Sequence, residues 1–141
     1  MRMVVGSDDK VAAYIAGATG DQMHHAFRTI GVYDNSGLIG GCAIDHWTGF
    51  GCEVSGAGKG IMLRSVRQAL CDLVYGYLGC RRMGIIVRKS NKRMQRMATR
   101  LGFTFEARLR RYYGTEDGIV YSLLSDEAVN LGHWRPIEKA A

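Results

Sequence analysis

Residues 55–60 have the types and spacing that could bind a phosphate group. They are Ser55, Gly56, Ala57, Gly58, Lys59 and Gly60, and a long stretch of helical periodicity follows them. Glycines let the backbone turn tightly and approach a ligand, and the first N–H groups of a helix are unpaired and lie at the positive end of its dipole. The segment therefore predicts an anion site at the start of that helix, with Lys59 adding positive charge.

Two well-known nucleotide loops do not fit this segment. A Walker loop needs a glycine where Glu53 stands and a serine or threonine where Gly60 stands. A dinucleotide-binding loop needs a third glycine where Ile61 or Leu63 stands. The segment therefore predicts an anion site of another kind.

A second candidate site residue is Asn91, which comes just before a basic amphipathic helix. One face of this helix is apolar, with Met94, Met97, Ala98 and Leu101, and the basic residues Lys92, Arg93, Arg96 and Arg100 lie elsewhere. Asparagine and serine are good N-caps, so either Asn91 or Ser90 is expected to start the helix.

The remaining pattern divides the chain into short elements. Strands are expected at residues 1–5, 26–33, 38–47, 50–54 and 83–87, and a β-hairpin is expected to pair 103–113 with 119–124. Other helices are expected to start at Asp8 or Asp9 and to run over 62–78, with Gly79 as the stop. Residues 129–141 are expected to form an irregular, partly mobile tail.

The composition bounds the class of protein. A chain of 141 residues, 47% of them hydrophobic, has the size of one domain, which we place at residues 1–128. No apolar stretch approaches ~18 residues and the start does not fit a secretory signal, so we expect a cytoplasmic protein without a membrane partner. The net charge of +6 favours polyanionic partners, which include nucleotide-bearing cofactors, acidic proteins and nucleic acid.

The cysteines and histidines show no metal-binding pattern. The cysteines Cys42, Cys52, Cys71 and Cys80 form no CxxC pair, and the histidines His24, His25, His46 and His133 lack zinc-finger spacing. We therefore expect no metal and reduced, mostly buried cysteines. Cys42 and Cys52 are interpreted as small core residues rather than as acyl carriers.

The order of these elements, together with three local motifs, resembles the GNAT (GCN5-related N-acetyltransferase) family. Residues 55–60 resemble its pyrophosphate loop, written Gln/Arg-x-x-Gly-x-Gly/Ala, with Ser55 in place of the usual Gln or Arg. Asn91 and the later Leu101-Gly102-Phe103 resemble the family's Asn-opened helix. The hairpin that follows resembles the branch that acetylates the N-termini of ribosomal proteins.

This resemblance implies an α+β fold and acetyl transfer from acetyl-coenzyme A to an amine by direct attack. The central, mostly antiparallel sheet would splay between strands 50–54 and 83–87, where the pantetheine arm inserts. Main-chain N–H groups on the strand that ends at Val54 would polarise the thioester carbonyl. The implied cofactor contacts are Val54, Ser55, Gly56, Gly58, Lys59, Gly60, Ile61, Asn91 and Arg93, with Arg96 as an alternative to Arg93.

The resemblance defines the catalytic residues less well. Glu53 could act as the base, or could merely point to solvent or pair with an arginine, because alternation in so short a strand does not fix its face. His46 is a second candidate base. The family's usual acid, a tyrosine, is replaced here by Ala98. Ser90, Tyr112, Tyr113 or water could supply the proton instead.

The acceptor amine stays open. The hairpin favours a protein N-terminus or a lysine side chain, with an aminoacyl-tRNA amine or a small metabolite behind them, and a monomer or homodimer is expected. Because the usual acid and the first motif residue are absent, a rival interpretation is a non-catalytic module of the same fold that binds coenzyme A or nucleic acid.

Overall fold

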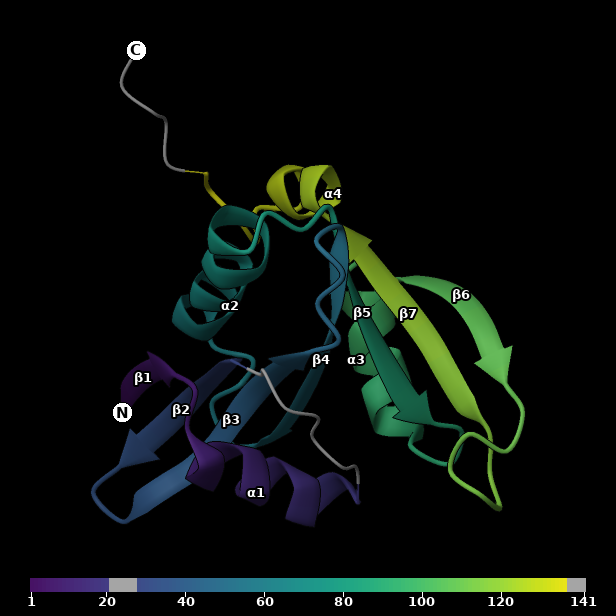
Figure 1. Cartoon of the computed structure of the whole chain (residues 1–141), viewed down its shortest axis with the longest axis horizontal. Coiled ribbons are helices and arrows are strands. Elements are labelled where there is room, and N and C mark those ends of the chain that lie inside the picture. Colours follow the sequence, from purple (N-terminus) through teal and green to yellow (C-terminus); the bar gives the residue numbers. More distant parts are fainter. Residues whose placement is uncertain (21–27, 137–141) are drawn as a thin grey trace.

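Seven strands form one sheet in the spatial order β1-β2-β3-β4-β5-β7-β6, with helices packed on it (Figure 1). The computed structural model describes residues 1–20 and 28–136. In chain order the elements are β1 (Arg2–Gly6), α1 (Asp9–Thr19), β2 (Arg28–Asp34), β3 (Gly37–Asp45), β4 (Gly51–Gly58), α2 (Arg64–Cys71), the π-helical η1 (Asp72–Tyr77), β5 (Arg82–Arg88), α3 (Lys92–Arg100), β6 (Thr104–Leu109), β7 (Gly118–Leu124) and α4 (Ser125–Asn130). Neighbouring strands are antiparallel except β4 and β5. The predicted α+β architecture is therefore confirmed.

β4 and β5 pair over a short stretch and then diverge. Their paired residues are Gly51 with Arg82, Cys52 with Met83, and Glu53 with Gly84. Beyond that stretch β4 stays paired with β3 as far as Gly58, and β5 stays paired with β7 as far as Arg88. The two halves of the sheet meet beneath α4 and open away from it (Figure 1). The predicted splay between these strands is confirmed.

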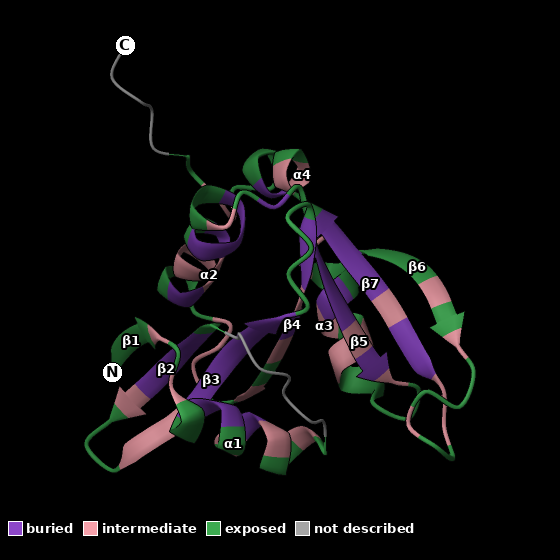
Figure 2. Ribbon diagram, in the orientation of Figure 1, coloured by how far each residue is buried: buried purple, intermediate pink, exposed green. Residues whose placement is uncertain are grey.

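The packing of β3 shows how the helices are divided between the two faces of the sheet. Ala43 packs with Val11 of α1 in a small cluster. The neighbouring Cys42 belongs to the main core, together with Val66 and Cys71 of α2. Successive side chains of a strand point to opposite faces, so α1 and α2 cover opposite faces of this half of the sheet. Most residues of the central strands β2, β3, β5 and β7 are buried (Figure 2).

The glycine-rich segment is partly strand, which corrects the expected boundary. The sequence predicts a strand that ends at residue 54, whereas β4 continues to Gly58. Gly58 and Ala57 lie opposite Gly40 and Gly41 of β3, so the two backbones approach each other with little side-chain bulk between them. The helix that follows begins at Arg64, and its π-helical continuation ends before Gly79, as predicted.

The first strand of the hairpin is shorter than the sequence predicts. β6 ends at Leu109 rather than at residue 113. The carboxylate of Asp117 pairs with Arg108 and accepts the backbone N–H of Arg111 at 2.8 Å. These contacts fold residues 110–117 into a wide turn, because they hold Asp117 between the two strand ends.

The expected irregular tail is ordered by packing over its first part. Val129 and Asn130 belong to α4. Beyond them, the Trp134 ring lies 5.3 Å from the Tyr75 ring, and its Nε1 donates to Asp72 Oδ1 at 3.1 Å. Residues 131–136 show no hydrophobic periodicity from which these contacts could be predicted. A domain boundary at residue 128 stays a prediction.

None of the helices in the two described ranges combines the length and the apolar character needed to cross a membrane. The expected cytoplasmic location stays a prediction.

Candidate functional site

A cleft of about 290 Å³ opens where β4 and β5 part. Its walls include Val54, Ser55 and Gly56 of β4, Ile85, Ile86 and Val87 of β5, Arg67 and Leu70 of α2, and Met94 and Ala98 of α3. Ala18 and Thr19, at the end of α1, also line it. Because α1 and α2 cover opposite faces of the sheet, the cleft passes between the strands and has walls from both faces.

α2 begins at the wide end of the cleft without a capping side chain. Its N-cap is Leu63, which makes no side-chain hydrogen bond, and its first turn holds no acidic residue. The turn before it is closed by the Leu63 N–H, which donates to the carbonyl oxygen of Gly60 at 3.2 Å. The first N–H groups of α2 therefore have no capping side chain. This is the local chemistry of an anion site.

Two glycines of the predicted loop are tightly packed against neighbouring residues. Gly58 has φ of +82°, and a Cβ there would lie 2.4 Å from the carbonyl oxygen of Ile39 and 2.5 Å from the hydroxyl of Tyr14. Gly60 also has φ of +82°, and a Cβ there would lie 2.8 Å from Val32 Cγ1. Neither residue lines the cleft.

Gly56 is the glycine of this segment that faces the cleft. A Cβ there would meet only ordinary contacts, the nearest being Ile61 Cδ1 at 3.4 Å. Bulk added at Gly56 would therefore enter the cleft itself, whereas bulk added at Gly58 would strain β3 and β4.

The predicted cofactor residues fall into two groups. Val54, Ser55, Gly56, Ile61 and Asn91 line the cleft. Gly58, Lys59 and Gly60 lie in the adjoining strand end and turn, and Arg93 is exposed in the first turn of α3. The second group lies outside the cleft wall, so its proposed contacts with a cofactor stay predictions.

Asn91 caps α3 at the rim of the cleft. Its Oδ1 accepts the backbone N–H of Met94 at 3.1 Å, which confirms the predicted cap. The side-chain nitrogen of Asn91 has no partner among the described residues. Asn91 can therefore cap the helix with its oxygen and donate to a ligand with its nitrogen.

Arg88 ties the wide end of the cleft to the β6–β7 turn. Its Nη1 lies 3.1 Å from Glu116 Oε1, and its guanidinium lies 4.1 Å from the centre of the Tyr113 ring. Hydrogen bonds from Ser90 and from Arg88 hold the pKa of Glu116 below its usual range. The Tyr113 hydroxyl donates to the carbonyl oxygen of Ile86 at 3.1 Å. Two of the candidate acids, Ser90 and Tyr113, are thus engaged in contacts that hold this end together.

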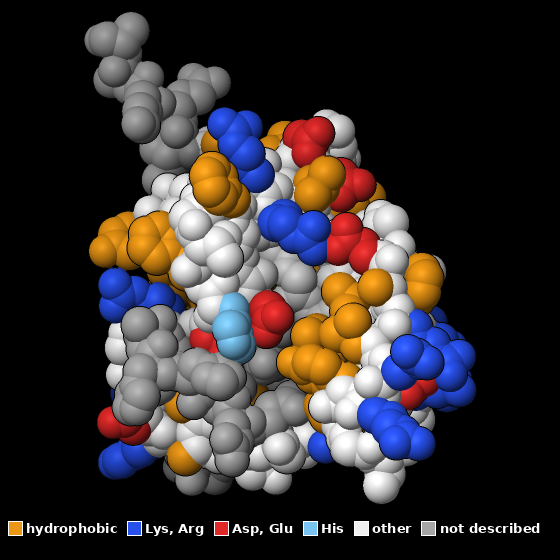
Figure 3. Space-filling model, turned by 45° about the vertical axis from the view of Figure 1, so that its right-hand side comes forward, with side chains coloured by type: hydrophobic (Ala, Val, Ile, Leu, Met, Phe, Trp, Pro, Cys, Tyr) orange, Lys and Arg blue, Asp and Glu red, His pale blue; other side chains and the backbone are white. Residues whose placement is uncertain are grey.

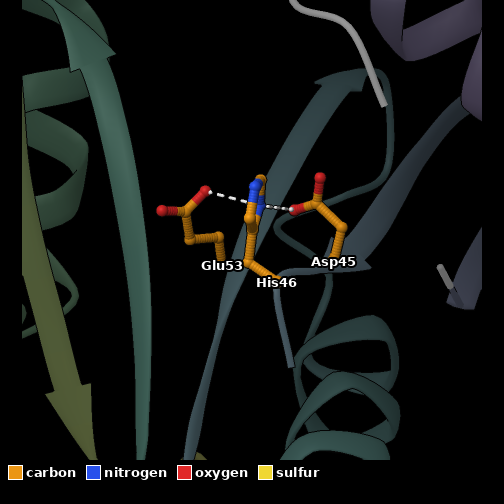
Figure 4. Close-up of side chains that lie close together, drawn as sticks. All are labelled: Asp45, His46 and Glu53. Atoms are coloured by element: carbon orange, nitrogen blue, oxygen red, sulfur yellow. Dashed lines mark ion pairs between the residues drawn. The ribbon is translucent and has the colours of Figure 1, made fainter. Parts of the chain in front are cut away.

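Asp45, His46 and Glu53 form a cluster at the start of β4 (Figure 4). His46 Nδ1 lies 3.2 Å from Asp45 Oδ1 and 3.1 Å from Glu53 Oε2. Asp45 is buried, whereas the other two side chains are partly exposed. Figure 3 shows a histidine and an acidic side chain next to each other at the surface of the molecule. A nitrogen within reach of two carboxylates suits a proton relay, and the donor set also suits a divalent cation.

The sequence predicts Glu53 and His46 as candidates but misses Asp45. The register pairs Asp45 directly with Glu53 across β3 and β4. Sequence periodicity carries no signal of this register, so only the paired strands reveal the third member. Two other histidines, His24 and His25, lie outside the described residues.

The packing of β4 fixes the face that Glu53 presents. Ala57 packs with the α1 cluster, whereas Val54 belongs to the main core on the side of α2. Because side chains alternate along a strand, Glu53 shares the face of Ala57. Glu53 also belongs to the last residue pair between β4 and β5. It therefore lies where the strands part, on the face opposite α2.

The described cysteines of the cleft are protonated core residues. Cys42 and Cys71 line its wall and are free and buried. Burial raises the pKa of each thiol to about 12. A thiol with such a pKa is a poor nucleophile near neutral pH, which supports the interpretation of Cys42 as a core residue rather than an acyl carrier.

Several solved structures of acetyltransferases are similar in fold to this chain. Spermidine/spermine N-acetyltransferase SpeG from Vibrio cholerae, in complex with manganese ions, matches with a TM-score of 0.70 and 15% identity, over 92% of this chain and 96% of that chain. A chimera of this enzyme with hSSAT matches with a TM-score of 0.71 and 14% identity, over 92% and 99%. Its glutamate-to-glutamine mutant forms match with a TM-score of 0.66 and 18% identity, over 77% and 70%.

No protein-family model and no curated protein matches the chain. At these identities the structural likeness shows the fold, which is the one that the sequence motifs resemble. A place in the ribosomal-protein branch stays a prediction.

Proposed function

We propose that this chain is an N-acetyltransferase, which moves the acetyl group of acetyl-coenzyme A to a primary amine by direct attack in a ternary complex. The observation that carries the proposal is the cleft between β4 and β5, with an uncapped helix start at its wide end and a carboxylate cluster where the strands part. The first feature suits an anionic donor and the second suits a cationic acceptor. The fold that the chain shares with solved acetyltransferases supports the same activity.

The donor fits the cleft from its wide end. Its diphosphate would lie at the start of α2, beside Lys59, and its pantetheine arm would follow β4 past Gly56 to Val54. Beyond Glu53, the backbone groups of β4 that face β5 have no strand partner among the described residues. Such groups can bond the amides of the arm and polarise the thioester carbonyl. The Asn91 side chain adds a donor from the opposite wall.

The acceptor amine would approach on the face of α1. Asp45 and Glu53 place negative charge there, which attracts a protonated amine. The amine must lose a proton before it attacks, and Glu53 can take that proton directly or through water. His46 lies in contact with both carboxylates and can pass the proton onward.

Two exposed aromatic side chains lie in the connection between the two strands that carry this cluster. Trp47 is 55% exposed and Phe50 is 75% exposed, both in the connection between β3 and β4. Aromatic faces attract cations, so these rings extend the surface that a charged amine can use.

The acceptor classes that fit this face are all primary amines. The resemblance of the hairpin favours a protein N-terminus or a lysine side chain. The similar solved structures are named for spermidine and spermine, which makes a small polyamine the next candidate. The carboxylate cluster would attract each of these amines, so an experiment must decide which of them is the acceptor.

A second candidate function is coenzyme A binding without turnover. The observation that favours it is Ala98, which is fully buried in the cleft wall where the resemblance places an acid tyrosine. Both functions need the donor cleft. They differ in whether an amine is acetylated.

Mass spectrometry of the acceptor, with free-thiol release as the rate assay, tests the proposal. The chain is incubated with labelled acetyl-coenzyme A and, separately, with spermidine, a peptide with a free N-terminus, a peptide with a lysine, and a blocked lysine-free peptide as the control. We expect amine-dependent thiol release and one acetyl group on an acceptor of the panel. Binding of coenzyme A without transfer to the panel or to cell extract would support the non-catalytic module. Absence of binding would contradict both functions.

A further inference from the structure

Hydrogen bonds join α2 to the end of α3 along one wall of the cleft. Arg67 Nη1 lies 3.3 Å from His133 Nδ1, and His133 Nε2 lies 2.7 Å from the carbonyl oxygen of Leu101. Arg67 belongs to α2, Leu101 is the C-cap of α3, and His133 comes from the segment after α4. All three residues line the cleft. We call this set the Arg67–His133 bridge.

The two partners of His133 assign the donor and acceptor roles of its ring nitrogens. The carbonyl oxygen of Leu101 only accepts, so Nε2 carries the hydrogen and donates it. The Arg67 guanidinium only donates, so Nδ1 is the unprotonated nitrogen that accepts. His133 therefore accepts from Arg67 through Nδ1 and holds its guanidinium in position.

One N–H group of Arg67 is left over. Its Nε is buried and has no hydrogen-bond partner among the described residues. A buried donor of a charged group is costly when it bonds to nothing, so its presence in a cleft wall points to a ligand atom that accepts from it.

The charges around the cleft leave Arg67 as the cation available to such a ligand. The lining residues within the described ranges include no aspartate or glutamate. The other lining arginine, Arg88, is paired with Glu116. Burial raises the pKa of the neighbouring Cys71 thiol to about 12, and the Arg67 guanidinium offsets only part of that rise.

The bridge lies toward the end of the cleft where the strands meet. Thr104, just after α3, pairs with Ser122, and Ser122 pairs with Gly84. Gly84 belongs to the last pair between β4 and β5. The end of α3, and with it the carbonyl oxygen of Leu101, therefore lies at the level where β4 and β5 part. A donor that enters with its thioester leading brings its sulfur to this end.

We propose that Arg67, oriented by His133, receives the thiolate that leaves during acetyl transfer. This inference rests on the proposed function. As the amine nitrogen bonds to the carbonyl carbon, the carbon–sulfur bond breaks and its electron pair stays on sulfur. The amine loses its ammonium proton before it attacks and a second proton once its nitrogen is bonded to carbon, and both protons leave through the Glu53 side. Arg67 donates a hydrogen bond from Nε to the sulfur without giving up its own proton.

A permanent cation beside the sulfur lowers the pKa of the departing thiol, so the thiolate leaves without prior protonation. This accounts for the small, buried Ala98 one turn before Leu101, because no acid is needed there. Arg67 is in this sense a catalytic residue, and His133 is its positioning residue.

Calorimetry with coenzyme A and with desulfo-coenzyme A, which lacks the sulfur, tests the assignment. At about pH 9, above the ordinary pKa of a thiol, Arg67→Met should weaken binding of coenzyme A about tenfold and leave desulfo-coenzyme A unchanged. Arg67→Lys, which keeps the charge, should lose less. Arg100→Met, which removes an exposed arginine at the end of α3, is the matched control and should change neither affinity.

Kinetics provide a second readout, because sulfur is uncharged in acetyl-coenzyme A and charged only as it leaves. Arg67→Met should lower kcat about a hundredfold with little change in KM for acetyl-coenzyme A. His133→Phe should lower kcat to a smaller extent, since it removes only the positioning bond. Thermal unfolding of each variant shows that it is folded.

Two outcomes would overturn the assignment. Equal loss of affinity for both ligands would place Arg67 at a phosphate or an amide instead of the sulfur. Unchanged affinity and unchanged kcat in a folded Arg67→Met would remove the role altogether. A parent protein that binds neither ligand would instead contradict the proposed function, so the two failures are distinguishable.

Discussion

Glu53 and Gly84 form the last residue pair between β4 and β5, and the cleft opens directly beyond them. Glu53 faces the side of α1, where His46 contacts both Glu53 and Asp45. The donor cleft lies largely on the other side, between α2 and α3. The point where the strands part thus lies between the carboxylates of Asp45 and Glu53 on one face of the sheet and a cleft wall that holds Arg67 and Arg88.

Glu53→Gln should lower turnover about a hundredfold near neutral pH, because the amide keeps the shape of the side chain but cannot accept the ammonium proton. Activity should recover in part at higher pH as free amine becomes available. Rates measured from about pH 6 to pH 10, a window set by ordinary carboxyl and amine pKa values, check this. Glu106→Gln, which removes a carboxylate paired with Arg82 on the edge of the sheet, is the control. Identical profiles for the Glu53 variant and the parent would leave Glu53 a structural role.

Gly56→Val should weaken acetyl-coenzyme A binding at least tenfold and leave the fold intact, because its side chain would enter the cleft. Gly58→Val should instead destabilise the protein, since its Cβ would lie 2.4 Å from the carbonyl oxygen of Ile39. Gly6→Val, at an open site of β1, is the control for both. Calorimetry and thermal unfolding separate the two effects. A folded Gly56→Val with parental affinity would place the donor elsewhere.

Asn91→Asp separates the cap from the proposed ligand contact. Aspartate still accepts the N–H of Met94, so thermal stability should hold. It cannot donate and it adds negative charge, so affinity for coenzyme A should fall about tenfold. If both quantities match the parent, Asn91 is a cap and nothing more.

Acid should destabilise the contact between Arg88, Ser90 and the β6–β7 turn. Hydrogen bonds from Ser90 and Arg88 hold the pKa of Glu116 below its usual range. The stabilisation from Glu116 is therefore complete above the ordinary carboxyl pKa of about 4.3 and is lost as the pH falls through the lowered value.

Thermal unfolding below about pH 4 measures this loss. Glu116→Gln should make the unfolding temperature less steeply dependent on pH than in the parent, whereas Asp126→Asn on α4 should keep the parental slope. A Glu116 variant with the full parental slope would show that other carboxylates govern the acid limb.

Trp134→Ala should lower the free energy of unfolding by about 1–3 kcal/mol. The Trp134 ring packs on Tyr75, and its Nε1 donates to Asp72. The substitution therefore removes both contacts between this side chain and η1. Chemical denaturation measures the change, with Trp47→Ala as the control because Trp47 is 55% exposed. If both variants change the free energy of unfolding by the same small amount, residues 131–136 do not contribute to stability.

The elements of the fold could be predicted from the sequence because their signals are local. Asp8 and Asn91 cap the helices that follow them, and the stop at Gly79 follows from backbone chemistry. The splay followed from the resemblance of the motifs in their order along the chain. These signals depend on residues a few positions apart, which is the range over which helical and strand periodicity can be read.

The site depended on contacts that cross the chain, and these only the tertiary structure decided. The register of β3 on β4 brought Asp45 to Glu53 and fixed the face of Glu53, because a shift of one residue would turn that side chain to the other face. Packing on Ile39 and Tyr14 showed that Gly58 is required by the sheet. The bridge from Arg67 to His133 joins residues 66 positions apart, and His133 lies in a segment that the sequence predicted to be an irregular tail. Periodicity carries no information about such distant pairs, since they meet only when helices and strands pack.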